Sequence, residues 1–560
     1  TAGKAAERDN TCMYNCSYLP VDDPKSFDEA MFILLCGTGV GFSVERQFIT
    51  KLPDVPNLFE SDTTVVIKDS KEGWAKGLRQ VLALLWAGEI PKWDVSKVRP
   101  AGAKLKTFGG RASGPAPLVD LFMFAVNTFR GAEGRKLSSI ECHDLMCKIG
   151  EVVVVGGVRR SAMISLSNLS DDRMRHAKSG NWWENAAHRA LANNSVSYSE
   201  KPDSIAFMRE WTALMESGSG ERGIFNREAS VKQAAKNGRR ETCYEFGTNP
   251  CSEIILRPNQ FCNLTEVVIR ANDSFEDLAR KVRIATILGT IQSTYTHFPY
   301  LRKVWQSNTA TERLLGVSLT GIMDNKLMTL DNKGLASTLE ELKNVAISTN
   351  AEWADRLGIP HSTAITCVKP SGTVSQLVDS SSGIHARHSP HYIRTVRGDN
   401  KDPLTQFMID QGIPSEPDVM KPDATTVFSF PMQSPIGAVH TADMTAIQQL
   451  EMWLMYQRHW CEHKPSVTIN VKADEWLEVG AFVYKYFDEM SGVSFLPFNE
   501  HTYQQAPYQE CTKEEFYDMI DKSPVNINWT KLSTYEQEDN TSGMQTMACT
   551  GDVCEMVDIT

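Results

Sequence analysis

The alternation of helix-like and strand-like segments is the feature of this sequence that most limits its fold. Helical periodicity recurs along the chain, over residues 75–90, 117–155, 204–236 and 274–301. Short strand-like runs lie between such stretches, as at residues 163–166, and residues 363–378 have the pattern strand, turn, helix. Chains that alternate in this way form α/β folds with crossover connections. We therefore predict an α/β protein.

Composition and charge exclude several classes of protein. Hydrophobic residues make up 41% and charged residues 23% of the 560 residues, as in ordinary globular proteins, so the chain is not disordered throughout. The net charge of -11 offers no basic surface to a nucleic acid. No apolar run approaches the roughly 18–20 residues that cross a bilayer. The sequence opens on Thr1 without a signal peptide, so we expect that an N-terminal part is missing.

The cysteines indicate a reducing compartment. There are 13 of them, an odd number at low density, which is not the pattern of a secreted disulfide scaffold. We expect a cytoplasmic protein in which most thiols are buried as small hydrophobic groups. Cys549 and Cys554 differ, because they lie in a polar segment from about residue 533 that is typical of a flexible tail. A redox pair is favoured there over half of a zinc site, since no second pair of ligands is nearby.

The segment NPCSEI at residues 249–254 carries the strongest chemical signal. Pro250 disfavours a helix at the preceding residue, so the segment is a turn or an extended loop. In an extended stretch residues two apart share a face, which would place Asn249, Cys251 and Glu253 together. An amide, a thiol and a carboxylate suit radical or acid–base chemistry on a hydroxylated substrate. A loop cysteine with solvated neighbours is the alternative.

Two further cysteines have informative surroundings. Cys262 follows Cys251 by eleven residues, an excursion of hairpin length that would bring the two thiols close. A core cysteine on a strand is the alternative for Cys262. Cys16 stands in the polar segment YNCSY, which is unusual for a buried structural cysteine.

Candidate anion sites lie at two turns. Ser371, Gly372 and Thr373 stand at the start of a helix-like run, where free backbone N–H groups bind anions, although an ordinary helix cap is the alternative. Arg159 and Arg160 follow a pair of glycines and would hold a phosphate or form a solvated turn.

Two other motifs favour structural interpretations. Residues 37–42 fail the dinucleotide-binding pattern at its third glycine and predict a tight turn. The three histidines within residues 385–391 lack a nearby carboxylate or cysteine, so we assign no metal to them.

Taken together, these motifs resemble the adenosylcobalamin-dependent (class II) ribonucleotide reductases, and most of all the monomeric ribonucleoside-triphosphate reductase type. Segments 37–42, 108–114 and 157–161 also resemble family segments. The resemblance spans nearly the whole chain and rests on five cysteines in this order: Cys16, Cys251, Cys262, Cys549 and Cys554.

The resemblance implies a fold and a division of the chain. The family fold is a ten-stranded α/β barrel of two antiparallel five-stranded halves, with a central finger loop and a flexible C-terminal tail. Residues 1–532 would form the catalytic barrel, with effector-binding elements within about residues 75–200. Residues 533–560 would form the redox-active tail.

The resemblance also implies roles for the central residues. Cys251 would be the thiyl radical site at the tip of the finger loop, and Asn249 and Glu253 would contact the ribose hydroxyls. Cys16 and Cys262 would be the reducing pair on the flanking strands. A radical at the 3′ carbon allows the 2′ oxygen to leave as water, and the cysteine pair then supplies two electrons. Radical initiation would belong to adenosylcobalamin.

Further residues would serve substrate, effector and reductant. The implied substrate-binding residues are Ser17, Ser371, Gly372 and Thr373. The loop that links the effector site to base selection would carry Arg159, Arg160 and Ser161. Cys549 and Cys554 would re-reduce the active-site disulfide. The implied partners are ribonucleoside triphosphates, dNTP effectors and thioredoxin or a similar dithiol, with no nucleic acid and no membrane.

Other classes fit the sequence less well. A class I large subunit would receive its radical through paired tyrosines near its end, and no Tyr-Tyr dipeptide occurs. A class III enzyme would need a glycyl-radical motif, and no glycine follows Cys554. A class I-type large subunit and a zinc- or thiol-binding regulatory protein remain as alternatives.

Overall fold

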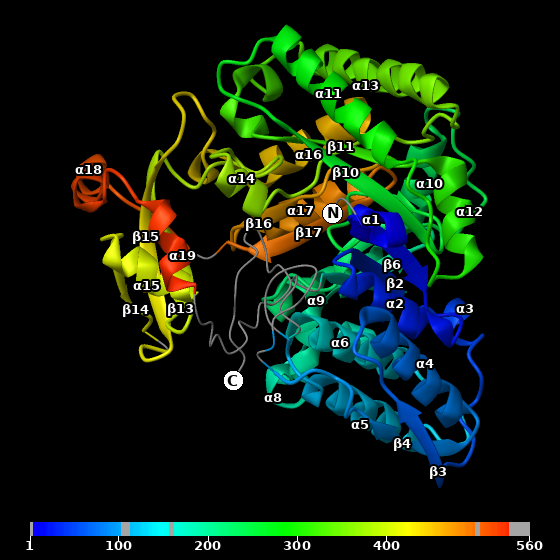
Figure 1. The fold of residues 1–560 in the computed structure, drawn as a ribbon. Coiled ribbons are helices and arrows are strands. Elements are labelled where there is room, and N and C mark those ends of the chain that lie inside the picture. The colour runs from blue at the N-terminus through cyan, green and yellow to red at the C-terminus, as the bar shows by residue number, and fades with distance from the viewer. Residues whose placement is uncertain are drawn as a thin grey trace.

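A ten-stranded mixed sheet forms the centre of the molecule (Figure 1). The computed structural model describes residues 4–101, 103, 112–155, 162–419, 421–498 and 504–536. In spatial order the strands are β12 (Thr366–Cys367), β11 (Leu315–Thr320), β10 (Gln260–Val268), β1 (Cys16–Pro20), β2 (Gly39–Ser43), β5 (Met163–Asn168), β6 (Ala192–Tyr198), β7 (Gly223–Asn226), β17 (Gly492–Pro497) and β16 (Thr468–Val471).

The ten strands divide into two antiparallel groups of five. Strands β1, β2, β5, β6 and β7 are parallel to one another. Strands β10 to β12 form one parallel set and β16 with β17 another, and these sets meet the first group at the antiparallel joints β1–β10 and β7–β17. A parallel bridge between Val368 and Pro465 joins the two ends of the sheet. The predicted α/β class and the two five-stranded halves are confirmed.

Helices cover the sheet on two sides. In Figure 1 one set lies in the lower part of the molecule and another in the upper part, each with its own apolar core. The lower set contains α2 (Lys25–Leu35), α4 (Lys71–Trp86), α5 (Ala116–Arg130) and α6 (Ser139–Val155), near the two-stranded sheet of β3 (Phe59–Val66) and β4 (Glu89–Asp94). The second core draws on α9 (Ser204–Ser217), α11 (Phe275–Gln292), α13 (Leu335–Leu357), α16 (Ala446–His459) and α17 (Trp476–Lys485).

The predicted helical stretches hold several separate elements. Residues 204–236 contain α9, strand β7 and α10 (Arg227–Ala235), because Gly218 ends α9 with a left-handed backbone at φ +63° and the Asn226 side chain caps α10. Residues 117–155 are also divided, into α5 and α6, and α11 ends at Gln292 rather than at residue 301. The helical periodicity of the sequence predicted where helices occur but not the residues at which one helix ends and the next element begins.

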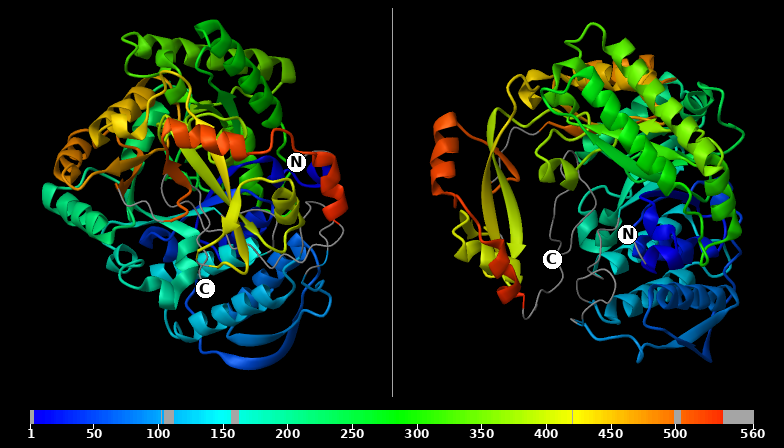
Figure 2. Two further views of the ribbon diagram at one scale, coloured as in Figure 1. Left: turned by 90° about the vertical axis from the view of Figure 1, so that its left-hand side faces the viewer. Right: turned by 45° about the horizontal axis from the view of Figure 1, so that its top comes forward.

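A smaller four-stranded sheet stands to one side of the main body in Figure 1 and faces the viewer in the left panel of Figure 2. The order is β14 (Ser415–Pro417), β15 (Thr425–Gln433), β13 (His391–Asp399) and β18 (Tyr508–Glu510). Helices α15 (Pro403–Asp410), α18 (Lys513–Lys522) and α19 (Leu532–Tyr535) accompany it. The predicted start of the tail at residue 533 therefore falls inside α19. Within the described ranges, no helix is long and apolar enough to cross a membrane.

Candidate active site

A finger loop lies against the inner face of the large sheet. We define it as residues 247–256, which contain the antiparallel strands β8 (Gly247–Thr248) and β9 (Ile255–Leu256). It packs so closely on the sheet that a Cβ on Gly41 would lie 1.7 Å from the Thr248 carbonyl oxygen. A Cβ on Gly247 would lie 2.2 Å from the ring of Tyr18. Because these two glycines have no side chain, the backbone of the finger loop can touch strand β2 and the Tyr18 ring.

This contact revises the interpretation of residues 37–42. Only Gly37 is in a turn, with φ +85°, and residues from Gly39 onward form strand β2. The glycine pattern there makes room for the finger loop.

The tip of the finger loop is a turn held by Asn249. Its carbonyl oxygen accepts from the Ser252 N–H at 2.9 Å, and its side-chain oxygen accepts from the Ile254 N–H at 2.9 Å. Ser252 has a left-handed backbone at φ +65°. The prediction that an extended stretch aligns Asn249, Cys251 and Glu253 was therefore wrong about the backbone. The turn itself brings the Asn249 amide and the Glu253 carboxyl to one thiol.

That thiol belongs to Cys16 on β1. Asn249 donates to the Cys16 sulfur at 3.2 Å, and the Cys16 thiol lies 3.9 Å from Glu253 Oε1. Cys262 on β10 is the direct strand partner of Cys16. Both thiols are buried, and Cys251 at the tip is only half-buried. Asn249, Glu253 and Cys16 thus meet at the turn that carries Cys251, and Cys262 stands opposite Cys16 on the next strand.

Burial keeps these thiols protonated at neutral pH. Burial, together with the nearby Glu253 carboxylate, raises the pKa of Cys251 to about 12. Burial and the same carboxylate raise the pKa of Cys16, and burial also raises that of Cys262. Neutral thiols carry the hydrogen atoms and protons that radical reduction requires, whereas thiolates do not.

The pKa of the buried Glu253 carboxyl is shifted in opposite directions by its surroundings. Burial raises its pKa, while the hydrogen bond from Asn249 and the ammonium groups of Lys369 and Lys464 lower it. Within the described part of the chain, its Oε2 atom is buried and has no hydrogen-bond partner. The carboxyl therefore has a free acceptor position in the interior.

Two lysines near Glu253 were missed by the sequence analysis. Lys369 follows β12, and its Nζ lies 3.7 Å from Glu266 Oε2. Lys464 precedes β16 and is fully buried, which lowers its pKa to about 7. In the sequence Lys464 stands in a charged triplet, which is typical of a solvated loop. The adjacent Trp460 and Pro465 are the only signal that the triplet enters the core.

The implied phosphate-binding residues stand where a helix begins. Residues 366–377 form strand, turn and helix α14 (Thr373–Leu377), as predicted. The Ser371 hydroxyl is buried and accepts from the Ser375 N–H at 3.1 Å, while the cap residue of α14 is Gly372. A phosphate role for Ser371, Gly372 and Thr373 stays a prediction.

Ser17 lies on the face of β1 away from Cys16. Cys16 and Tyr18 belong to the core around the finger loop, whereas Leu19 belongs to the core beneath the helices. Side chains alternate along a strand, so Ser17 shares the face of Leu19. Its hydroxyl donates to the Gly39 carbonyl at 2.7 Å. The implied contact between Ser17 and substrate stays a prediction.

Some predicted residues lie outside the described ranges. They are Arg159, Arg160, Ser161, Cys549 and Cys554. In the sequence, both arginines lie between Val155, where α6 ends, and Met163, where β5 begins.

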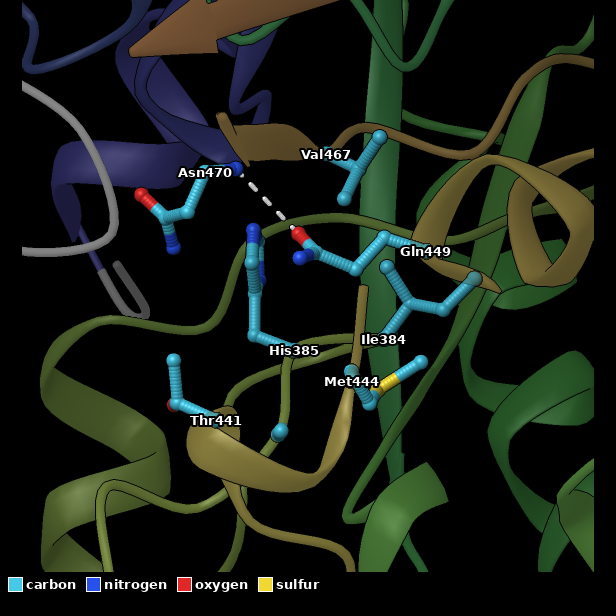
Figure 3. A pocket seen from close by; sticks show the side chains of 8 residues that line it. Ile384, His385, Thr441, Met444, Gln449, Val467 and Asn470 are labelled. Carbon is cyan, nitrogen blue, oxygen red and sulfur yellow. Dashed lines mark hydrogen bonds between the residues drawn. The ribbon is translucent and has the colours of Figure 1, made fainter. Parts of the chain in front are cut away.

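The histidine cluster does not converge on one point. Both ring nitrogens of His385 are engaged, with the Ser382 carbonyl at 3.0 Å and the Thr468 N–H at 3.2 Å. His388 packs on Tyr392, and His391 packs on Phe516. Figure 3 shows His385 in a small pocket together with side chains from α16 and β16. In the portion of the chain that is described, no three His, Cys, Asp or Glu side chains are placed to hold a metal ion.

Comparisons with known proteins point to one family. Residues 53–129 match the family model described as the insertion domain of B12-dependent ribonucleotide reductase. The chain is 28% identical to the adenosylcobalamin-dependent ribonucleoside-triphosphate reductase of Euglena gracilis, over 99% of this chain and 75% of that protein. The protein of the same name from Lactobacillus acidophilus is 27% identical, over 93% of this chain and 78% of its own length.

A solved structure shares the fold. It is described as the crystal structure of a B12-dependent (class II) ribonucleotide reductase, and it superposes with a TM-score of 0.79 at 22% identity. The match covers 94% of this chain and 84% of that one. The resemblance to class II reductases that the motifs indicate is confirmed, and the fold is that of the class II barrel.

Proposed function

We propose that this chain is an adenosylcobalamin-dependent ribonucleotide reductase that converts ribonucleoside triphosphates to 2′-deoxyribonucleoside triphosphates. The observation that carries the proposal is that Asn249 and Glu253, from the turn that holds Cys251, contact the thiol of Cys16, whose direct strand partner is Cys262. The names of the relatives support both the cofactor and the triphosphate substrate.

The residues fit the cofactor's chemistry. Adenosylcobalamin, when bound, supplies the initiating radical through homolysis of its cobalt–carbon bond. Cys251 is the only one of the three central thiols that is not fully buried, so a radical arriving from outside the sheet reaches it first. Its pKa of about 12 keeps the hydrogen atom on the sulfur.

Each central side chain then has one task. Cys251, as a thiyl, takes the hydrogen atom from the 3′ carbon and returns it at the end of the reaction. Glu253 accepts the proton of the 3′ hydroxyl, for which its unpartnered Oε2 is available among the described residues. Cys16 or Cys262 gives a proton to the leaving 2′ oxygen. The two thiols lose two electrons and two protons in total and become a disulfide.

The finer parts of the proposal concern substrate binding, control by effectors and re-reduction of the active-site disulfide. Ser371, Gly372 and Thr373 bind substrate phosphates, and the loop of Arg159 to Ser161 transmits the identity of a dNTP effector. Cys549 and Cys554 reduce the active-site disulfide and are recharged by thioredoxin or a similar dithiol. The enzyme works in the cytoplasm, which the low density of cysteines supports.

A reductase assay tests the core of the proposal. CTP or ATP should yield the deoxynucleotide only when adenosylcobalamin and a dithiol are both present. Equal product without adenosylcobalamin would overturn the cofactor assignment.

Competition tests the finer parts. With CTP and CDP offered together, CTP should be reduced in preference, and preference for CDP would overturn the triphosphate assignment. Adding dATP should change base preference in the wild type and less so in Arg160→Ala. Effector-insensitive base choice in the wild type would remove the loop from this role.

A further inference from the structure

A buried lysine closes the base of the turn that carries Cys251. The side chain of Lys464 is fully buried. Its ammonium group donates to the Ser252 hydroxyl at 3.0 Å and to the Thr248 hydroxyl at 3.3 Å. Thr248 stands before the turn and Ser252 stands within it. One ammonium group therefore spans the two limbs of the finger loop.

The backbone makes the same connection. The Lys464 N–H donates to the Glu253 carbonyl at 3.0 Å, so the lysine holds the turn through both main chain and side chain. The neighbouring bridge between Val368 and Pro465 fixes this segment where the two ends of the large sheet meet. Lys464 thus connects the finger loop to the segment where the two ends of the large sheet meet.

The residues packed around the Lys464 ammonium group leave it little room to move. It lies 4.6 Å from the centre of the Phe225 ring. On another side, a Cβ on Gly492 would lie 2.6 Å from the Ser252 hydroxyl oxygen and 3.2 Å from Lys464 Nζ. Because β17 begins with glycine, the lysine and the serine can meet. Ser252 also holds a left-handed backbone that its neighbours must maintain.

A buried ammonium group needs a reason. Burial of an ammonium group that has no hydrogen-bonded carboxylate is costly, and it lowers the pKa of Lys464 to about 7. Among the described residues, the side chain of Lys464 contacts two hydroxyl groups and an aromatic ring. Lys369, by contrast, lies beside the Glu266 carboxylate. A methionine would fill the position of Lys464 at lower cost for stability alone.

We propose that Lys464 is a positioning residue that fixes the Cys251 turn against the sheet through Thr248 and Ser252. The part of this inference that concerns catalysis rests on the proposed reductase function. The part that concerns the turn does not.

Hydrogen exchange of the full chain, without substrate or cofactor, tests the turn. In Lys464→Met, exchange over residues 247–256 should accelerate by about tenfold relative to the wild type, because the turn opens locally. The matched control is Lys178→Met, which removes a mostly buried lysine that donates to the Ala192 carbonyl and the Glu221 carboxylate. Its exchange over the same residues should stay within about twofold of the wild type.

Kinetics tests the catalytic part. In Lys464→Met kcat should fall by about tenfold or more while KM changes by less than about threefold, because a displaced Cys251 affects the chemical step. The acid limb of the pH profile should also move to higher pH, since the Lys464 charge lowers the pKa of Glu253. The titratable groups that interact with this carboxyl are Lys369, Lys464, Cys16, Cys251, Cys262 and Cys367.

Two milder variants keep the test decisive if Lys464→Met does not fold. Ser252→Ala removes one acceptor, and Gly492→Ala crowds the contact without removing a charge. Both should accelerate exchange over residues 247–256. Exchange and kcat within about twofold of the wild type in these variants would overturn the positioning role. A wild type that reduces no nucleotide would overturn the proposed function instead, and the exchange result would still decide the role of Lys464 in the turn.

Discussion

Cys16 and Cys262 are direct partners across the antiparallel joint between β1 and β10, and both side chains lie in the core around the finger loop. Directly opposed residues of antiparallel strands have Cβ atoms about 4.5–5.5 Å apart, close to the separation of about 3.5–4.5 Å in a disulfide. The strand register therefore places two reduced cysteines where a small movement joins them.

Replacing one member of this pair should stop reduction of the substrate. In Cys262→Ala, deoxynucleotide formation should fall below about 1% of the wild-type rate, because a single thiol cannot supply two electrons. Product per active site is the measurement, with a small dithiol as reductant. The matched control is Cys367→Ala, another fully buried cysteine of the same core, which should retain turnover. Similar losses in both variants would indicate a packing effect.

Cys251→Ser should abolish turnover and leave nucleotide binding nearly unchanged. Serine preserves the size of the side chain, but its O–H bond is too strong to yield a comparable radical. Binding of CTP, measured by equilibrium dialysis, should stay within about twofold of the wild type. Multiple-turnover reduction by this variant would remove Cys251 from the central role.

Glu253→Gln should abolish activity and stabilise the fold at neutral pH. Burial raises the pKa of Glu253, so the folded state disfavours the charged form. This cost is absent below the pKa of the unfolded chain and develops as pH rises through the higher folded pKa. At pH 7 the variant should gain about 1–2 kcal/mol in the free energy of unfolding. Thermal melts should show the gain shrinking toward pH 4, whereas a lower melting temperature at pH 7 would contradict this account.

Glu312→Gln should strongly destabilise the protein. Glu312 and Arg240 are fully buried and joined by two hydrogen bonds of 2.9 and 2.8 Å, and Arg257 lies 3.0 Å away. Removing the carboxylate leaves the buried Arg240 without its counter-charge and Arg257 with only Glu241, at 3.5 Å, at a cost of about 3–5 kcal/mol. Urea denaturation measures the loss. Asp62→Asn, which breaks an exposed pair with Lys92, should leave the midpoint unchanged.

The tail cysteines should matter only after the first turnover. Cys549→Ser or Cys554→Ser, starting from reduced enzyme, should give about one product per active site and then stall with thioredoxin. A small dithiol should restore part of the steady state by reaching the active-site disulfide directly. Unchanged thioredoxin-driven rates would show that the tail is not the shuttle.

The sequence was most informative where chemistry is local. Segment 249–254 was identified from its residues, because a proline restricts the backbone beside an amide, a thiol and a carboxylate. The family resemblance paired Cys262 with Cys16, as the strand register confirms, whereas the spacing of the cysteines alone did not. The spacing pointed to Cys251, whereas strand pairing brings Cys262 to Cys16, and the pairing of strands distant in sequence is not encoded in short-range periodicity.

Other features of the site could not be predicted from the sequence, for different physical reasons. Lys464 looked like a surface charge, because its burial depends on a bridge between segments nearly a hundred residues apart, at Val368 and Pro465. Gly41 looked like part of a turn, because the backbone that approaches it belongs to residue 248.

The small four-stranded sheet is assembled from two separated stretches of chain, with β13 and β15 at one end and β18 at the other. Residues 434–507 lie between them and include β16 and β17 of the large sheet. During synthesis, β13 therefore leaves the ribosome with one edge unpaired and keeps it open until the last strands of the large sheet have followed. Such an edge is a template for pairing with another chain. A protein truncated after residue 498 would retain all ten strands of the large sheet and should aggregate through β13.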